Sequence, residues 1–330
     1  MEYNLKEIIG NNGKPRKVRS LTTFTSVPRL FLILPLFNII NGSESLDEPI
    51  TVPVHQNTRN IEIKNAQLTI DNDFDIFLFI LRKVFRSNST SIEFSTTEMM
   101  DELNIEKVNR AQYLKTFIKS VKRLSNIHVE YEERVNGEWQ HTFFNFIEGR
   151  LTKSKGTIEV SKFFIEFFGN LKELYEINPE ILNVLNKYQR ILYVLYVCNR
   201  MSVTNYFSVD RLKERFNINS KKMPDKQFIK KIRDTNLELQ DLGLITGFKE
   251  IKTLDKDGKN NNPRQPTVQF DVDYSYKSLY PKVQKLRNIV AMQKTKKAQK
   301  KSIKGLNLDA FESDIPDSFK ETIEASKTTK

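Results

Sequence analysis

The sequence predicts an α+β chain in which one unit of secondary structure, helix–strand–helix–helix–hairpin, occurs twice in tandem. Three observations predict this fold class. Apolar residues recur at helical spacing in two separate regions, alternating strand-like runs follow each region, and the elements of both regions come in the same order. The chain has 330 residues, and at about 150 residues per domain this length fits two medium-sized domains.

The first unit begins after residue 60 with a helix whose apolar residues follow the spacing i, i+3, i+4, i+7 and i+11. They are Phe74, Phe77, Leu78, Leu81 and Phe85. Asp71, Asn72 and Asp73 at the start of this helix are candidate N-caps, and capping accounts for the two aspartates more simply than a metal site shared with Asp75. A short strand at residues 92–94 follows, and the S-x-x-E sequence at residues 95–98 is a capping box that begins a short helix. A longer helix is predicted over residues 107–124.

Two alternating runs, residues 128–133 and 138–146, come next and are joined across Asn136-Gly137. Asn-Gly between alternating runs is the strongest short sequence signal for a β-hairpin. Helix, strand, helix, helix and hairpin together are the order of a winged helix, which is a helix-turn-helix with a β-hairpin wing after its third helix. We therefore predict this hairpin to be the wing of a first winged-helix domain.

The second half repeats this order. We predict helices over residues 187–200, 208–216 and 225–242, a short strand at 206–207, and wing strands at 244–254 and 267–272. Phe94-Ser95 matches Phe207-Ser208 at the same point of the two units. The predicted organisation is an extension over 1–60, winged-helix domains over 61–150 and 187–280, linker helices over 151–186, and a C-terminal arm and tail over 281–330.

The two ends of the chain have a different composition. The first 60 residues look irregular and flexible, and their apolar run at 30–40 is too short for a bilayer, so we expect a cytoplasmic protein without a membrane partner. Residues 281–304 carry nine basic side chains and no acidic one. Residues 309–324 carry six acids against one lysine, which indicates a basic helix or arm followed by a disordered acidic tail.

Catalytic and metal-binding patterns are nearly absent. The single cysteine, Cys198, lies in an apolar run, which argues against a disulfide scaffold or a cysteine zinc site. The three histidines form no HxH or HExxH pattern. Pro15 stands where a phosphate loop needs Ser or Thr, and residues 255–258 are half of a calcium loop at most. We therefore expect no enzyme activity, no cofactor and no metal.

The net charge of +12, from 53 Lys and Arg against 41 Asp and Glu, suggests a polyanionic partner. Side chains opposite the apolar stripe of the two third helices, together with Arg123 and Asn236 beside them, are candidates for binding duplex DNA. They are Lys115, Lys119, Lys122 and Arg123 in the first unit, and Lys226, Lys230, Arg233 and Asn236 in the second. Such side chains reach phosphates and base edges when a helix enters the major groove. The alternative is a solvated charged face, and the position as third helix in two units favours DNA.

The two predicted wings differ in charge. The first carries acidic residues near its tip, namely Glu130, Glu132 and Glu133. The second carries basic residues, namely Lys249, Lys252, Lys256, Lys259 and Arg264. Because phosphates repel carboxylates, we expect the second domain to be the dominant DNA reader.

The segment QLTIDNDFDIFLFILR, residues 67–82, together with the element order, resembles the plasmid replication initiator (Rep) proteins that consist of two winged-helix domains. The resemblance covers roughly residues 60–280. It implies binding of origin direct repeats (iterons) as a monomer, a dimer that represses its own gene, opening of an AT-rich region and recruitment of the host replicative helicase. Two alternatives remain: a tandem winged-helix transcriptional regulator, or a nicking, relaxase-type enzyme that uses a tyrosine such as Tyr113.

Overall fold

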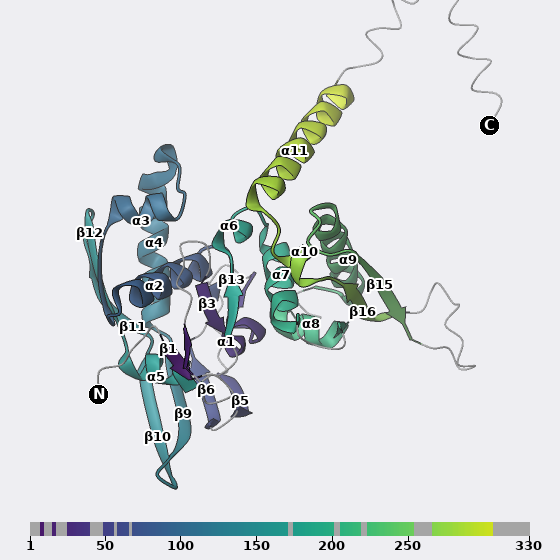
Figure 1. Ribbon diagram of the computed structural model, residues 1–330. Helices are drawn as coiled ribbons and strands as arrows, with labels where there is room; N and C mark the ends of the chain where they lie inside the picture. Colours follow the sequence, from purple (N-terminus) through teal and green to yellow (C-terminus); the bar gives the residue numbers. More distant parts are fainter. Residues whose placement is uncertain are drawn as a thin grey trace, which may run out of the picture. The chain divides into compact units, whose positions relative to one another are not determined.

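A computed structural model of the chain is shown in Figure 1. The described residues are 7–9, 15–17, 25–39, 49–55, 58–65, 68–170, 174–200, 205–218, 223–253 and 266–305. The chain divides into two compact units, Met1–Pro281 and Lys282–Lys330. The first unit contains both predicted repeats, so the prediction of two tandem winged-helix domains is confirmed by the order of its elements.

The helices of the first domain lie where the apolar spacing places them. They are α2 (Asp73–Ser87), α3 (Thr96–Glu102) and α4 (Arg110–Ser125), with strand β8 (Ser91–Ser95) before α3 and the 3-10 turn η1 (Lys107–Asn109) before α4. The Ser95 hydroxyl accepts a hydrogen bond from the backbone N–H of Glu98 at 3.0 Å, as a capping residue does. The N-cap of α2 is Asn72, within the segment expected to cap this helix, but its side chain makes no capping hydrogen bond.

The wing of the first domain is not the predicted hairpin. Strand β8 pairs with β12 (Lys155–Val160), and β12 pairs with β11 (Ile147–Leu151), giving the order β11-β12-β8. The second domain has the same arrangement, with the order β15-β16-β14. The first wing is therefore the β11–β12 hairpin, and this domain extends to Val160, whereas a boundary at residue 150 would cut β11.

The predicted hairpin does form, from β9 (His128–Val135) and β10 (Glu138–Asn145), and Asn136 and Gly137 have positive φ at its turn. Its partner, however, is a hairpin of the N-terminal extension, β5 (Ile50–His55) and β6 (Thr58–Lys64). The four strands form one sheet in the order β10-β9-β6-β5. The local turn signal predicted the hairpin correctly, but it carries no information about which strand lies beside it.

The second domain follows the prediction closely. Its helices are α7 (Lys187–Asn199), α8 (Val209–Phe216), α9 (Asp225–Asp241) and α10 (Tyr276–Leu279), and its strands are β14 (Tyr206–Ser208), β15 (Gly247–Lys252) and β16 (Thr267–Asp273). The Asn186 side chain caps α7, and Ser208 caps α8 by accepting a hydrogen bond from the N–H of Arg211 at 3.2 Å. Helix α7 is the centre of this domain, and Cys198 lies buried in it, as predicted.

Residues 25–39, which we call the N-terminal strap, contradict the picture of an irregular, flexible extension. The strap consists of β3 (Thr25–Pro28), α1 (Arg29–Ile33) and β4 (Phe37–Asn38). Strand β3 pairs with β13 (Leu174–Ile177) of the linker, and β4 pairs in parallel with β7 (Leu68–Thr69). The apolar run that is too short for a membrane is therefore part of the protein core. Strands β1 (Glu7–Ile9) and β2 (Pro15–Lys17) pair with each other.

Aromatic packing joins the strap to the first domain and to the linker helix α5 (Lys162–Asn170). Phe31 is 3% exposed, and its ring lies 5.9 Å from that of Phe77 on α2 and 5.7 Å from that of Phe164 on α5. Phe37 lies 4.7 Å from the ring of Phe74. Aromatic pairs at such separations add to the free energy of burial. Phe164 and Phe167 of α5 are therefore core residues, whereas Phe163 on the same helix is 44% exposed.

A buried arginine joins the strap to the second domain. Arg215 of α8 is 2% exposed and donates to the carbonyl oxygens of Leu32 at 2.9 Å and Phe37 at 2.8 Å. Burial lowers the pKa of this guanidinium to about 10, so it remains charged at neutral pH. Backbone carbonyls satisfy the buried charge, and the strap is thereby held between the two domains.

A second buried arginine joins the domains directly. Arg190 of α7 donates from Nη1 to Asp75 Oδ2 of α2 at 2.9 Å, and to the carbonyl oxygens of Ile70 at 3.2 Å and Asp71 at 3.0 Å. Its Nε donates to the carbonyl oxygen of Leu182, the last residue of α6 (Pro179–Leu182), at 2.9 Å, and to that of Leu185, three residues beyond the helix, at 3.2 Å. We call this arrangement the Arg190 junction.

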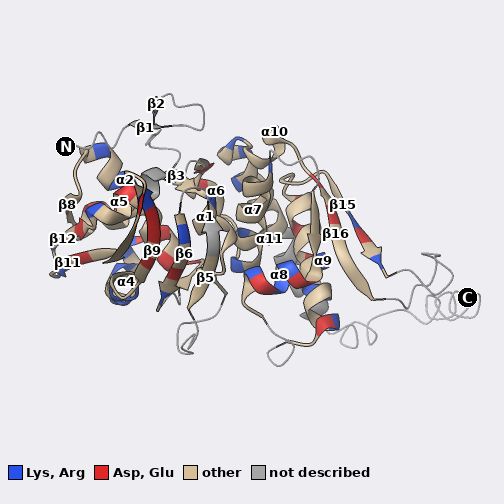
Figure 2. Cartoon of the chain, turned by 90° about the horizontal axis from the view of Figure 1, so that it is seen from below, with Lys and Arg blue, Asp and Glu red and all other residues tan. Residues whose placement is uncertain are grey.

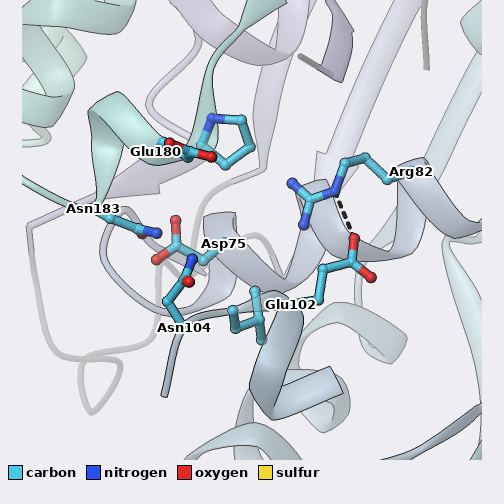
Figure 3. Close-up of a pocket in the computed structure, with 8 residues that line it drawn as sticks. Asp75, Arg82, Glu102, Asn104, Glu180 and Asn183 are labelled. Atoms are coloured by element: carbon cyan, nitrogen blue, oxygen red, sulfur yellow. Dashed lines mark hydrogen bonds and ion pairs between the residues drawn. The ribbon is translucent and has the colours of Figure 1, made fainter. Parts of the chain in front are cut away.

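A small cavity of about 60 Å³ adjoins the Arg190 junction. Figure 3 shows the Asp75 carboxylate directed toward Asn104 and Asn183 in this cavity, with the Arg82–Glu102 ion pair on its other side. Burial raises the pKa of Asp75, and the charge of Arg190 opposes that rise. The carboxylate thus depends on Arg190 for compensation of its charge.

The second unit contains α11 (Val283–Gly305), which confirms that the basic segment is helical. Eight of its residues are Lys or Arg, and none is acidic. The predicted acidic tail lies outside the described residues.

We predict that Arg190→Met lowers the free energy of unfolding of the full chain by about 3–5 kcal/mol, because it leaves the Asp75 carboxylate buried without a counter-charge. Urea unfolding followed by circular dichroism measures this loss. Arg110→Met is the control, since Arg110 pairs with Asp101, whose side chain is 61% exposed. Such a surface pair contributes at most about 1 kcal/mol. Equal small losses in both variants would contradict the role of the junction.

Candidate nucleic-acid interface

Helix α4 presents its predicted lysines to solvent. Phe117, Val121 and Leu124 bury one side of the helix against the domain core. On the opposite side Lys115, Lys119 and Lys122 are exposed. Helix α4 contains no acidic residue, so no carboxylate of the helix itself competes for these three ammonium groups. Figure 2 shows basic residues on α4 and acidic residues on the neighbouring strand β9.

Arg123, the fourth predicted residue of this helix, has a structural partner instead. Its Nε donates to Asp73 Oδ2 at 2.9 Å, and its Nη2 donates to Asp73 Oδ1 at 2.6 Å and to the Ser120 hydroxyl at 3.0 Å. Asp73 is fully buried and also accepts from the backbone N–H of Thr69 at 2.7 Å. A bidentate pair of this kind fixes α4 against the start of α2, so Arg123 serves the fold.

Helix α9 divides its charge along its length. Phe228, Ile232 and Leu239 form the buried side. The exposed side carries lysines in its first half, Lys226 and Lys230, and carboxylates in its second half, Asp234 and Asp241. The first half of the helix therefore suits a polyanion and the second half does not.

Asn236 is a wrong prediction as a DNA-binding residue. Its side chain is 0% exposed, and its Oδ1 accepts a hydrogen bond from the Tyr196 hydroxyl at 2.6 Å. The angular position of Asn236 on a helical wheel lies near the edge of the buried face, and the large Tyr196 side chain extends that face over it. The amide is therefore part of the contact between α9 and α7.

Arg233 is held by the second wing. It donates from Nε and Nη2 to the carboxylate of Glu250 on β15, and the Nη2–Oε2 distance is 2.8 Å. The Thr267 hydroxyl on β16 donates to the same Oε2 at 2.8 Å. This ion pair fixes the position of the wing relative to α9. The Arg233 side chain is still 43% exposed, so its remaining N–H groups face solvent.

The second wing carries Lys249, which is exposed, and Lys252, which is half-buried. The other three residues predicted in this wing, Lys256, Lys259 and Arg264, lie outside the described residues. The described part of the wing thus supplies two of the five predicted basic side chains.

The tip of the first wing is basic, and sequence analysis missed it; the exposed Glu148 and Glu159 lie toward the other end of its two strands. Arg150, Lys153 and Lys155 are exposed at its turn and the adjoining strand ends. The sequence repeat held a signal that could have located this wing. The strands β8 and β14 both end on a serine that caps the next helix, so they are equivalent, and in each domain the strand that pairs with them belongs to the wing. Gly156 belongs to this arrangement, because a Cβ there would lie 2.4 Å from the Phe94 ring.

The acidic residues of the β9–β10 hairpin are neutralised by β6. Lys64 Nζ donates to Glu130 at 2.6 Å, and Arg59 Nε donates to Glu132 at 2.6 Å. These hydrogen bonds hold the pKa of both carboxyls below the usual range. Arg59 also lies over the Trp139 ring at 3.8 Å. The argument that acids on the first wing repel DNA therefore does not apply, because these acids are neither on the wing nor unpaired.

Features that a nicking enzyme needs do not come together in the described part of the chain. Tyr113 is largely buried near Asp75, and that burial raises its pKa, which disfavours the phenolate nucleophile. Asp73 and Asp75 are engaged by Arg123 and Arg190. Among the described residues, no group of three or more His, Cys, Asp or Glu side chains is placed to hold a metal ion. No described helix has the length and apolarity needed to cross a membrane.

We predict that the Arg233–Glu250 pair stabilises the fold in a pH-dependent way. Arg233 holds the pKa of Glu250 below 4.5, so the folded state releases this proton more readily than the unfolded state. The stabilisation by this pair is complete above the pKa that Glu250 has in the unfolded chain. It is lost as the pH falls through the lower pKa that Glu250 has in the folded chain. Glu250→Gln should therefore lower stability at pH 7 by at most about 1 kcal/mol. The difference from wild type should shrink progressively in urea unfolding as the pH falls below 4.5; a constant difference would contradict the ionic role.

Comparison with known proteins gives matches among solved structures alone. The sequence matches no protein-family model and none of the curated proteins. The chain is similar to a crystal structure of domains 2 and 3 of RctB, a selenomethionine derivative, with 13% identity, a TM-score of 0.49, and coverage of 76% of this chain and 99% of that chain. A second crystal structure of RctB domains 2–3 gives 14% identity, a TM-score of 0.46, and coverage of 72% and 94%. The two winged-helix units are therefore identified by their own element order and strand pairing.

Proposed function

We propose that the chain is a sequence-specific duplex-DNA-binding protein that initiates plasmid replication at origin direct repeats. The observation that supports this best is the row of exposed lysines on α4, Lys115, Lys119 and Lys122, on the third helix of a winged-helix unit. The third helix is the element that such units insert into the major groove. Lysines on its outer side neutralise phosphates and release the counterions condensed on DNA.

We also propose that the first domain contributes at least as much to DNA affinity as the second, which reverses the ranking expected from the sequence. Helix α4 carries three unopposed lysines, whereas α9 carries acids in the second half of its exposed side. The first wing adds Arg150, Lys153 and Lys155, close to the strand ends. In the second domain the contacts come from Lys226, Lys230, Lys249 and Lys252, with Lys256, Lys259 and Arg264 as further candidates.

The replication role rests on the resemblance of residues 67–82 and of the two-domain order to Rep initiators. The Arg190 junction and the N-terminal strap support it, because they connect the two winged-helix domains within one chain, as a protein that binds one repeat as a monomer needs. In this proposal the chain opens an AT-rich region beside the repeats and recruits the host replicative helicase. A homodimer represses its gene, and the chain itself acts without a cofactor in the cytoplasm.

We predict that Lys115→Ala combined with Lys119→Ala weakens DNA binding through the loss of two phosphate contacts. Each contact contributes about 0.9 to the slope of log K against log salt concentration, so the slope should become shallower by about 1.8. Lys226→Ala combined with Lys230→Ala should reduce it by the same amount or less. Fluorescence anisotropy at several salt concentrations, with duplex from the DNA flanking the gene, measures both slopes.

The matched control is Lys162→Ala combined with Lys277→Ala. These two exposed lysines lie on α5 and α10, which follow β12 and β16 at the strand ends opposite the tips of the wings. The control removes the same charge and should leave the slope unchanged within error. Equal slope changes in the control and in the α4 variant would show that bulk charge, rather than the α4 row, binds the DNA.

We predict that a circular DNA replicates in the natural host when it carries the gene, its flanking DNA and a selectable marker, but no other origin. The Lys115→Ala, Lys119→Ala variant should give at least about tenfold fewer transformants, because origin occupancy falls with affinity. Counting transformants tests this.

The same DNA separates the alternatives. If the chain represses a reporter gene placed behind this DNA, and the circular DNA never replicates, the chain is a transcriptional regulator. Cleavage of a flanking oligonucleotide in Mg²⁺ or Mn²⁺, abolished by Tyr113→Phe, would identify a nicking enzyme and contradict the proposal.

A further inference from the structure

Val108 stands out on the surface of the first domain. Its side chain is 85% exposed and lies in η1, immediately before α4. It continues the exposed row of α4, because residues 108, 112, 115, 119 and 122 are separated by steps of four, three, four and three. Side chains at this spacing lie along one side of a helix. Val108 and Gln112 are therefore the N-terminal members of the row that ends in three lysines.

The start of this helix is fixed without help from the Val108 side chain. Arg110 donates from Nε to the carbonyl oxygen of Ile105 at 3.3 Å and forms an ion pair with Asp101. Asn109 donates from Nδ2 to Glu106 at 3.4 Å. Polar contacts thus position the turn, while the valine side chain has almost its entire surface in water.

The side chains of the row change from uncharged to positively charged along its length, as a base-reading helix requires. Its C-terminal part consists of three lysines, which suit phosphates. Its N-terminal part has an apolar side chain and an amide, so these two members of the row carry no charge for a phosphate, and the exposed Glu106 and Lys107 beside them have opposite charges. Residues at the N-terminal end of a reading helix approach the base edges, whereas residues farther along reach the backbone.

We infer that Val108 and Gln112 read A·T base pairs in the major groove, an inference that rests on the proposed function. The methyl groups of Val108 would pack on the C5-methyl group of thymine, which is the apolar feature of that groove. The Gln112 amide would donate to N7 or accept from N6–H of adenine, and bidentate pairing uses both ends of the amide. The specificity of the first domain thus comes from two uncharged side chains that the lysine row positions.

The test begins with selection of duplexes from a random pool by the full chain, which yields the preferred site. Thymines in that site are then replaced by uracil one at a time, which removes the methyl group and leaves base pairing intact. At one or two thymines the wild-type chain should lose about three- to fivefold in affinity, the value of one buried methyl group. Val108→Ser should bind the thymine and uracil forms equally.

Val268→Ser is the matched control, because Val268 is a 42% exposed valine on β16 of the second domain. This variant should keep the wild-type ratio of thymine to uracil affinity at the positions that depend on Val108. Gln112→Ala should lower affinity about 5- to 100-fold at one A·T pair and relax the preference there.

The outcomes separate the inference from the proposed function. If no sequence is enriched from the pool, both the proposed function and the inference are wrong. If a sequence is enriched, but Val108→Ser keeps the wild-type thymine-to-uracil ratio at every position, the function stands and the reading role of Val108 is overturned.

Discussion

The buried guanidinium of Arg190 is the constraint on which the rest of the structure depends. Removing a guanidinium from water is unfavourable unless its charge is paired and its N–H groups are hydrogen-bonded. Here a carboxylate of α2 and four backbone carbonyls provide those acceptors, and they come from the first domain and from the linker. Helix α7, the centre of the second domain, is thereby connected to the first helix of the first domain.

The N-terminal strap adds a second connection of the same kind. Its carbonyls accept from Arg215 of the second domain, and its phenylalanines pack against α2 and α5. In the proposed function, two DNA-binding units joined in this way gain from each other, because once one is bound the other meets DNA at a high effective concentration. The proposal therefore needs only modest contributions from each third helix, with the row on α4 and the lysines of α9 acting together.

Local pattern predicted most of the secondary structure, and its failures concern partners that are distant in sequence. Helical spacing and the Ser95 cap located the helices of both domains, and Asn136-Gly137 located the β9–β10 hairpin. Which hairpin is the wing depends on pairing with β8, about 60 residues earlier in the sequence, and a turn signal does not contain that information. Lys115 and Lys119 were predicted from the helical wheel. Arg123 and Asn236 were misassigned because Asp73 and Tyr196, which bind them, come from other helices.

The central claim is that both third helices of one chain read duplex DNA. Hydroxyl-radical footprinting of the full chain on its selected duplex tests this claim most directly. The account predicts two protected segments, one per domain, and loss of protection in one segment alone when Lys115 and Lys119 are replaced by alanine. A single protected segment that this change leaves intact, or protection of single-stranded DNA alone, would contradict it.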